Sequence, residues 1–226
     1  MNLLILGRGK MGALVEELAR GRKHTVHAVD IDENLHAAAL TKEKLRHVDV
    51  VIDFTTPAAV MENIEGCVRA QKNLVVGTTG WYDEIPTVRA MVEKSGIGLV
   101  FAANFSIGVN LFFEIAKTAA AALRLDYSGK ISERHHIHKK DAPSGTAIML
   151  SKVLHLAAGK KLEIESFREG EVVGVHELAF DSVNDTITLR HDAKSRRGFA
   201  EGAVRAAEWL NGKKGFYDFK DVWREL

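Results

Sequence analysis

A glycine-rich turn near the start of the chain constrains the fold more than any other feature. The apolar run at residues 3–6 leads directly into the hexapeptide GRGKMG at residues 7–12, and apolar residues then recur at the spacing of one helical face. A second apolar run, Thr25–Val29, is followed by Asp30. A G-x-G-x-x-G sequence that lies between a strand and a helix, with an acid at the end of the next strand, is typical of a dinucleotide-binding unit.

Each glycine of this turn has a physical role in holding a nucleotide. Gly7 permits the tight turn, Gly9 lets the backbone approach a pyrophosphate, and Gly12 lets the helix pack closely against the strand. The free N–H groups of the helix N-terminus then face the pyrophosphate. A glycine-rich turn that binds no ligand remains the alternative. We predict that the loop binds a nicotinamide cofactor through Gly7, Arg8, Gly9, Lys10, Met11 and Gly12.

Asp30 bears on which nicotinamide cofactor is used. A carboxylate at this position accepts hydrogen bonds from both ribose hydroxyls and repels a 2′-phosphate. Ile31 and Asp32 follow it, so no arginine is at hand to receive that phosphate, although Lys10 could reach it and partly offset the repulsion. We therefore predict NADH as the preferred cofactor, with NADPH possible.

Apolar strands and helical stretches alternate as far as residue 106. The runs at residues 48–54, 74–76 and 99–102 are typical of parallel strands that are covered on both faces. Helices are expected between them, the first with Thr56 as its N-cap and Pro57 in its first turn. This alternation predicts an α/β fold with a Rossmann-type doubly wound parallel sheet.

Ligands of such sheets lie beyond the carboxyl ends of the strands. The segments GTTG and AANF, at residues 77–80 and 102–105, follow two of the predicted strands. Small residues and threonine hydroxyls suit loops that lie against a cofactor, although GTTG by itself is also a common kind of turn. The predicted cofactor contacts are Gly77, Thr78 and Thr79 of GTTG, and Asn104 falls at the end of the next predicted strand, in the same cleft.

The second half of the chain has a different character. An alanine-rich helix is expected at residues 111–125 and a strand at 130–138, then another helix and three further strands with a turn at Asn184 and Asp185. This pattern predicts a C-terminal α+β domain with an open mixed sheet. Because exposed sheets often pair between subunits, we expect an oligomer. The predicted domains are a dinucleotide-binding domain of residues 1–106 and 197–226, and a substrate-binding and oligomerisation domain of residues 107–196.

The stretch ERHHIHKKDAPSGT, at residues 133–146, is the most specific signal in the chain. Its histidines give or take a proton near neutral pH, and its lysines supply fixed positive charge. A Ser-Gly-Thr turn that opens a helix offers hydroxyl and N–H donors to a carboxylate. The combination predicts a site that binds and protonates a small polyanion. Alternation along a strand would send His135 and His136 to opposite faces, so both serve one site only if the strand bends or ends there.

Two other interpretations of this cluster stay open. It could be a solvated strand end, or a zinc site that uses the imidazoles, although the adjacent lysines oppose a dication and we predict no metal. Arg196, next to Arg197, is either a solvated surface residue or a ligand of the same anion as Lys139.

The composition excludes several classes of protein. A formal net charge of +1 argues against nucleic acid or an acidic membrane as the main partner. Cys67 is the only cysteine, which excludes an intramolecular disulfide. No apolar stretch suits a signal peptide or a membrane span, so a cytoplasmic location is expected.

Several motifs together resemble one known family. GRGKMG, VIDFTTP, GTTG, AANFSIGVN, ERHHIHKKDAPSGTA and AKSRRGFAEGAVRAAEWL run along nearly the whole chain in the order seen in 4-hydroxy-tetrahydrodipicolinate reductases (dihydrodipicolinate reductases) of diaminopimelate and lysine biosynthesis. The HHxxKxDAPSGTA pattern is the most specific of them. The phosphate loop departs from the family, which usually has a form close to GxxGRMG.

The resemblance implies an NAD(P)H-dependent oxidoreductase that reduces a cyclic imine dicarboxylate to tetrahydrodipicolinate. It implies that His135 is the catalytic acid/base, that Lys139 is a second proton donor and carboxylate partner, and that His136 contacts the substrate. It also implies that Gly145 and Thr146, with Ser144 beside them, bind the substrate carboxylate. The segment of Ala102, Ala103, Asn104 and Phe105 is implied to contact the cofactor. Members are typically homotetramers assembled through the C-terminal sheets, which implies the same here.

Three rival functions remain. Another oxidoreductase on the same fold is possible, although a thiol-dependent semialdehyde dehydrogenase is disfavoured because Cys67 lies inside a helical pattern. A nicotinamide-responsive binding protein would bind cofactor without turnover. The zinc interpretation of the histidine cluster would correspond to a hydrolase.

Overall fold

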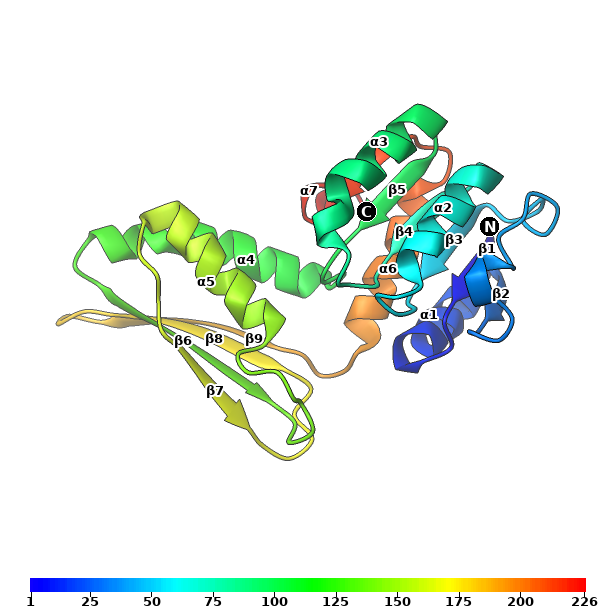
Figure 1. The fold of residues 1–226 in the computed structure, drawn as a ribbon. Coiled ribbons are helices and arrows are strands. Elements are labelled where there is room, and N and C mark those ends of the chain that lie inside the picture. The colour runs from blue at the N-terminus through cyan, green and yellow to red at the C-terminus, as the bar shows by residue number, and fades with distance from the viewer. The chain divides into compact units, whose positions relative to one another are not determined.

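Two units make up the chain in a computed structural model that describes residues 1–226. Unit 1 comprises Met1–Ser106 and Arg197–Leu226, and unit 2 comprises Ile107–Arg196. The chain thus leaves unit 1 after its fifth strand, forms all of unit 2, and returns to unit 1 with its last helices and strand (Figure 1).

Unit 1 is built on a six-stranded parallel sheet in the order β10-β5-β4-β3-β1-β2. Its central strands are apolar and buried on both faces, as expected for a parallel sheet between two helix layers. The strands are β1 (Asn2–Leu6), β2 (Thr25–Val29), β3 (Val50–Asp53), β4 (Asn73–Val76), β5 (Gly98–Phe101) and β10 (Gly215–Asp218).

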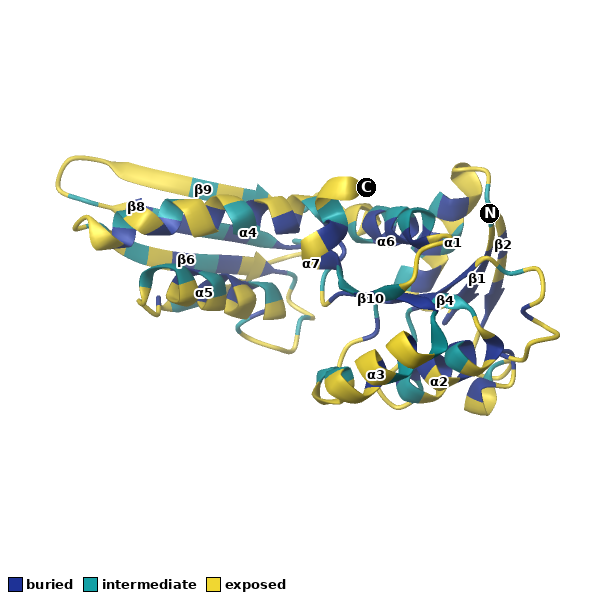
Figure 2. Cartoon of the chain, turned by 90° about the horizontal axis from the view of Figure 1, so that it is seen from above, coloured by how far each residue is buried: buried dark blue, intermediate teal, exposed yellow.

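Helices cover both faces of this sheet, so the predicted doubly wound Rossmann-type fold is confirmed. Figure 2 shows α1 and α6 on one side of the buried strands and α2 and α3 on the other. The helices of unit 1 are α1 (Lys10–Gly21), α2 (Val60–Ala70), α3 (Ile85–Ser95), α6 (Arg197–Leu210) and α7 (Phe219–Val222), with 3-10 turns at Leu35–Ala37, Tyr82–Glu84 and Trp223–Glu225.

Two details of unit 1 differ from the sequence-based expectations. Helix α2 begins at Val60 and its N-cap is Ala59, so the prediction for Thr56 and Pro57 was wrong. The carbonyl of Thr56 accepts the N–H of Ala59 and of Val60, which places Pro57 in the turn before the helix. The C-terminal segment also adds the strand β10 to the sheet beside β5, which the sequence did not predict.

Unit 2 has a four-stranded sheet in the order β7-β6-β8-β9, in which β6 and β7 are parallel and the other pairs antiparallel. Both long helices pack on one face of this sheet and bury Ile131, Leu178 and Phe180 (Figure 1). The predicted open mixed sheet is therefore confirmed. The elements are α4 (Ile107–Ala119), a 3-10 turn (Ala120–Arg124), β6 (Ser128–His135), α5 (Gly145–Ala158), β7 (Ile164–Arg168), β8 (Val175–Asp181) and β9 (Thr186–Asp192).

None of the helices is both long and apolar enough to cross a membrane.

Candidate functional site

The segments that we predicted to bind the cofactor lie along one edge of the sheet of unit 1. Gly7 follows β1, Asp30 follows β2, Gly77 follows β4, and Asn104 lies three residues beyond β5. Because all these strands are parallel, their carboxyl ends share an edge. The chain passes from β1 outward to β2 and then back across to β3, so β1 and β3 flank the topological switch point where such sheets bind ligands.

The glycine loop has the geometry of a phosphate cradle. Gly7 has a φ of +89°, which favours glycine, and its N–H donates to the carbonyl of Val29 (2.9 Å). A Cβ on Gly12 would lie 1.8 Å from the Gly7 oxygen, so helix and turn touch only because that side chain is missing. A Cβ on Gly9 would meet nothing within 4 Å. Gly9 caps α1 without a side-chain hydrogen bond, and no acid lies in the first turn, so this helix end is open to an anion.

Asp30 is held beside this loop. Its Oδ1 accepts the N–H of Ile31 (2.9 Å) and, more weakly, that of Arg8 (3.5 Å). Arg8 and Lys10 are both exposed, while Met11 is half-buried. The carboxylate and the two cations therefore belong to the same exposed edge at the start of α1.

A buried carboxylate that we did not single out from the sequence lies behind this edge. Asp53, at the end of β3, is fully buried, and its Oδ1 accepts hydrogen bonds from the Thr78 hydroxyl (2.6 Å) and from the N–H and hydroxyl of Thr55. Its Oδ2 accepts the Asn63 amide (2.8 Å). Burial raises the pKa of Asp53, and the hydrogen bonds only partly oppose that rise. Its signal in the sequence was a lone acid within an apolar strand.

The hydroxyl of Thr78 thus faces inward, toward Asp53, whereas Thr79 is exposed. Gly77 is needed for close packing, because a Cβ there would lie 2.2 Å from the ring of Phe54. The loop of residues 102–105 is fixed in a similar way. A Cβ on Gly202 of α6 would lie 1.8 Å from the Phe105 oxygen, so the helix holds this loop against the sheet.

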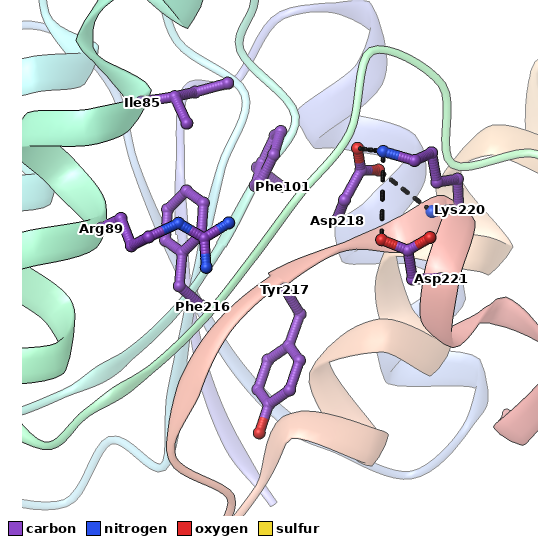
Figure 3. Close-up of a pocket in the computed structure, with 8 residues that line it drawn as sticks. All are labelled: Ile85, Arg89, Phe101, Phe216, Tyr217, Asp218, Lys220 and Asp221. Atoms are coloured by element: carbon purple, nitrogen blue, oxygen red, sulfur yellow. Dashed lines mark hydrogen bonds and ion pairs between the residues drawn. The ribbon is translucent and has the colours of Figure 1, made fainter.

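One pocket of about 420 Å³ in unit 1 contains none of the predicted site residues (Figure 3). Its charged groups already have partners, since Lys220 pairs with Asp218 (2.6 Å) and the Arg89 guanidinium lies 4.6 Å from the centre of the Phe216 ring. The pocket also contains no histidine and no residue of the basic cluster, so we do not place the reaction there. It is lined by Ile85, Arg89, Phe101, Phe216, Tyr217, Asp218, Lys220 and Asp221.

In unit 2 the basic cluster begins where β6 ends. Ile131, Glu133 and His135 alternate onto the face that the helices cover, and all three are buried. The strand stops at His135, and the N–H of His136 donates instead to the carbonyl of Val172 (2.7 Å). The strand therefore ends between the two histidines, and His136 lies outside its alternation.

His135 is paired with a buried carboxylate. Its Nδ1 forms a short hydrogen bond with Oε2 of Glu133, which is 1% exposed. Burial lowers the pKa of His135, and Lys139 and Arg168 lower it further, while Glu133 opposes them. Burial disfavours the ionised form of Glu133, but hydrogen bonds from Ser166, His135 and Arg168 outweigh it and hold its pKa below the usual value.

The remaining predicted substrate contacts lie close to this pair in the sequence. The Lys139 ammonium forms an ion pair with Asp141 (2.9 and 3.0 Å), which holds the pKa of Asp141 below its usual value. Ser144 is the N-cap of α5, and its buried hydroxyl accepts the Ala147 N–H (3.2 Å). Gly145, the first residue of α5, is exposed, and a Cβ there would meet nothing within 4 Å.

The three histidines of the cluster do not converge on one point. His135 faces Glu133, whereas the rings of His136 and His138 lie 6.2 Å apart from each other. No group of three or more histidine, cysteine, aspartate or glutamate side chains is placed to hold a metal ion. Arg196 is exposed in the segment between β9 and α6.

Sequence reasoning missed three residues of this cluster: Glu133, Arg168 and His176. Glu133 had a usable signal, because it lies two residues before His135 and two after an apolar residue on the same strand. Arg168 and His176 lie on β7 and β8, and only the strand pairing brings them to β6.

Comparison with known proteins agrees with this architecture. The model of the dihydrodipicolinate reductase N-terminus matches residues 1–105, and that of the C-terminus matches residues 108–223. The chain is 38% identical to the 4-hydroxy-tetrahydrodipicolinate reductase of Christiangramia forsetii, over 100% of this chain and 99% of that protein. It is 42% identical to that of Neisseria meningitidis, over 79% of this chain and 73% of that protein.

Solved structures agree as well. Dipicolinate-bound dihydrodipicolinate reductase from Paenisporosarcina sp. TG-14 matches with a TM-score of 0.82 and 25% identity, over 98% of this chain and 99% of that chain. Aspartate dehydrogenase from Thermotoga maritima, with a TM-score of 0.54 and 15% identity, shares only the fold. The resemblance found in the motifs is confirmed, and the chain belongs to the dihydrodipicolinate reductase family.

Proposed function

We propose that this chain reduces 4-hydroxy-tetrahydrodipicolinate to tetrahydrodipicolinate with a nicotinamide cofactor. The observation that carries the proposal is the cluster at the end of β6, where a histidine backed by a buried carboxylate lies beside Arg168 and the start of α5. A dianionic ring that gains a hydride and a proton requires an acid, positive charge and N–H donors, and this cluster offers all three. Membership of the family supports the same reaction.

The residues divide the chemistry between them. Loss of water from the substrate leaves a conjugated cyclic imine, and the bound cofactor supplies the hydride. His135 donates the accompanying proton, with Lys139 as a second donor and as a partner for one carboxylate. His136 and the N–H groups of Gly145 and Thr146 hold the substrate carboxylates, and Arg196 is proposed as a further carboxylate ligand. The family member solved with dipicolinate, an aromatic dicarboxylate, supports a substrate of this kind.

We propose that unit 1 holds NADH in preference to NADPH. The open space at Gly9 and the uncapped N-terminus of α1 fit a pyrophosphate. Asp30 lies at the end of β2, where it would accept ribose hydroxyls and repel a 2′-phosphate. The proposed cofactor contacts of the other loops are Gly77, Thr78, Thr79, Ala102, Ala103, Asn104 and Phe105.

We also propose a homotetramer that assembles through the uncovered face of the sheet of unit 2. This face carries paired charges of both signs, such as Lys130 with Glu165 (2.6 Å), and Phe167, which is 44% exposed under Arg134. An apolar residue among paired charges suits a self-complementary contact. A sedimentation experiment on the Phe167→Glu variant tests this, and dissociation of the oligomer is the expected result.

We also propose a cytoplasmic location, which the buried and unpaired Cys67 supports.

A coupled assay tests the reaction itself. The substrate is made in place from pyruvate and aspartate semialdehyde by the upstream synthase, and the oxidation of NADH and of NADPH is followed separately. We expect both to be consumed, with a higher kcat/KM for NADH. His135→Gln should lower kcat about a hundredfold or more, and Lys139→Ala should lower kcat and raise the substrate KM. If the wild type oxidises neither cofactor above the synthase-only background, the proposed function is wrong.

A further inference from the structure

The buried carboxylate of Glu133 connects several parts of the substrate site, and this suggests a role beyond packing. Glu133 is 1% exposed and lies on the face of β6 that the helices cover. Burying an ionised carboxylate is costly unless hydrogen bonds and charges compensate for it. Here its partners hold its pKa below the usual value, so the group is ionised at neutral pH. The sheet thus maintains a negative charge behind His135.

The two oxygens of this carboxylate have different partners. Oε2 binds Nδ1 of His135, whereas Oε1 accepts Nη1 of Arg168 (3.0 Å) and the N–H of Ser144 (3.3 Å). Ser166, which lies directly opposite on β7, adds a further hydrogen bond. One side chain therefore links the ends of β6 and β7 to the first residue before α5.

Arg168 extends this link to the loop that carries Lys139. Its Nη2 donates to the carbonyl of Asp141 (2.6 Å), and its Nε lies 3.4 Å from the carbonyl of Lys139. The guanidinium is only 21% exposed and faces Glu133 with its remaining nitrogen. The backbone at Lys139, Asp141 and Ser144 is thus tied to one carboxylate, either directly or through Arg168.

We propose that Glu133 is a positioning residue, which fixes the ring of His135 with the proton on Nδ1 so that Nε2 is the atom that exchanges a proton with the substrate. This inference rests on the proposed function. An ionised carboxylate can only accept hydrogen bonds, so the Nδ1 that it binds must carry the hydrogen. The arrangement is that of a carboxylate–histidine pair in which the acid orients the base and stabilises its cationic form.

The surroundings of Nε2 support this assignment. A Cβ on Gly174 would lie 2.9 Å from Nε2 of His135, and no positive φ requires a glycine there. The missing side chain therefore leaves room at the atom that we assign to proton exchange. The charged or titratable groups that face this ring are Glu133, Arg168, Lys139 and His176. The ring centres of His135 and His176 are 5.2 Å apart, and His191 lies opposite His176 on β9.

The Glu133→Gln variant tests the proposal, because it keeps the shape of the side chain and removes its charge. We expect kcat to fall by about ten- to a hundredfold with little change in the KM for NADH, as is typical when an orienting partner is lost. Without the carboxylate the His135 cation is less stable, so the activity that needs protonated His135 should disappear at a lower pH than in the wild type. Glu163→Gln, an exposed acid just before β7, is the matched control.

Imidazole nitrogen-15 shifts of His135 give a second readout that does not depend on turnover. We expect the neutral ring of the wild type to carry its proton on Nδ1, and the variant to show a mixture of tautomers. A wild-type ring protonated on Nε2 would overturn the proposal, even if the variant failed to fold. So would a folded variant whose pH profile matches that of the wild type, because loss of packing alone would lower kcat without moving the profile. Absence of turnover in the wild type, with the Nδ1 tautomer intact, would refute only the proposed function.

Discussion

His176 should make the stability of unit 2 depend on pH. This histidine lies on β8 beside His135, is 4% exposed, and has its Nε2 3.0 Å from the hydroxyl of Ser144, while its Nδ1 has no hydrogen-bond partner. Burial lowers its pKa from 6.5 to about 4, and the positive charge of a protonated His135 acts in the same direction. The folded chain therefore resists the protonation that the unfolded chain accepts.

The sign and size of the effect follow from this difference. Because the pKa is lower in the folded state, the stabilisation is fully present above 6.5 and is lost as the pH falls toward 4. A pKa difference of one between the unfolded and folded chain corresponds to 1.36 kcal/mol. The difference between 6.5 and about 4 therefore lowers the free energy of unfolding by about 3 kcal/mol once the pH has fallen below both values. His176→Gln keeps a side chain that can bind the Ser144 hydroxyl but cannot be protonated in this range.

Urea unfolding at several pH values measures this difference. All three tryptophans, Trp81, Trp209 and Trp223, lie in unit 1, so their fluorescence reports that unit and far-UV circular dichroism must report unit 2. We expect the stability advantage of the wild type over His176→Gln to shrink by about 3 kcal/mol between about pH 7 and about pH 4. His155→Gln, on the exposed side of α5, is the control, because it removes an imidazole that is not buried.

A constant difference between wild type and variant across this range would refute the reasoning. It would mean that the folded chain accommodates the charged His176, through solvent or through a rearranged Glu133, and that burial does not exclude the proton. The carboxylates with lowered pKa values, Glu133 and Asp141, also lose stabilising charge in acid, but they are present in both proteins and cancel in the comparison.

Three further substitutions give sharp expectations. Asp30→Ala should lower kcat/KM for NADH about tenfold and leave that for NADPH unchanged or higher, because a charged acceptor of ribose hydroxyls is lost. Asp141→Asn should lower the substrate KM about two- to fivefold in the coupled assay, since Asp141 competes for the Lys139 ammonium. The raised pKa of Asp53 makes the folded wild type bind a proton more readily than the unfolded chain, so Asp53 adds stability to unit 1 as the pH falls. In Asp53→Asn this gain should be absent when unfolding is followed by tryptophan fluorescence.

Local patterns were enough to predict most of the fold. The strand β2, the helix that the Ser-Gly-Thr turn opens, and the turn at Asn184 and Asp185 all follow from residues that are neighbours in the sequence. Elements that depend on distant partners were missed or misplaced. Strand β10 exists because it pairs with β5, more than a hundred residues earlier, and β6 ends early because Val172 takes the N–H of His136.

The candidate site also contains residues that a local motif reveals and residues that only strand pairing brings in. His135, Lys139 and Ser144 could be proposed as site residues because their chemistry is visible in a short motif. The partners that set their properties were not found, because they come from other strands. Arg168 reaches Glu133 through the parallel pairing of β6 with β7, and His176 reaches it through the antiparallel pairing with β8. Register is a tertiary property, so no local motif encodes it.

Asp53 and Glu133 show what the strand pairing adds in physical terms. Both are buried acids on strands, and each collects donors from separate segments because a carboxylate offers several acceptor sites. The donors on Asp53 are neutral hydroxyls and amides, so burial dominates and its pKa is raised. Glu133 receives Arg168 and His135, and its pKa is lowered instead. The two carboxylates, both inaccessible to solvent, thus have opposite charge preferences, and of the two Glu133 combines a stable negative charge with a titrating neighbour on which that charge can act.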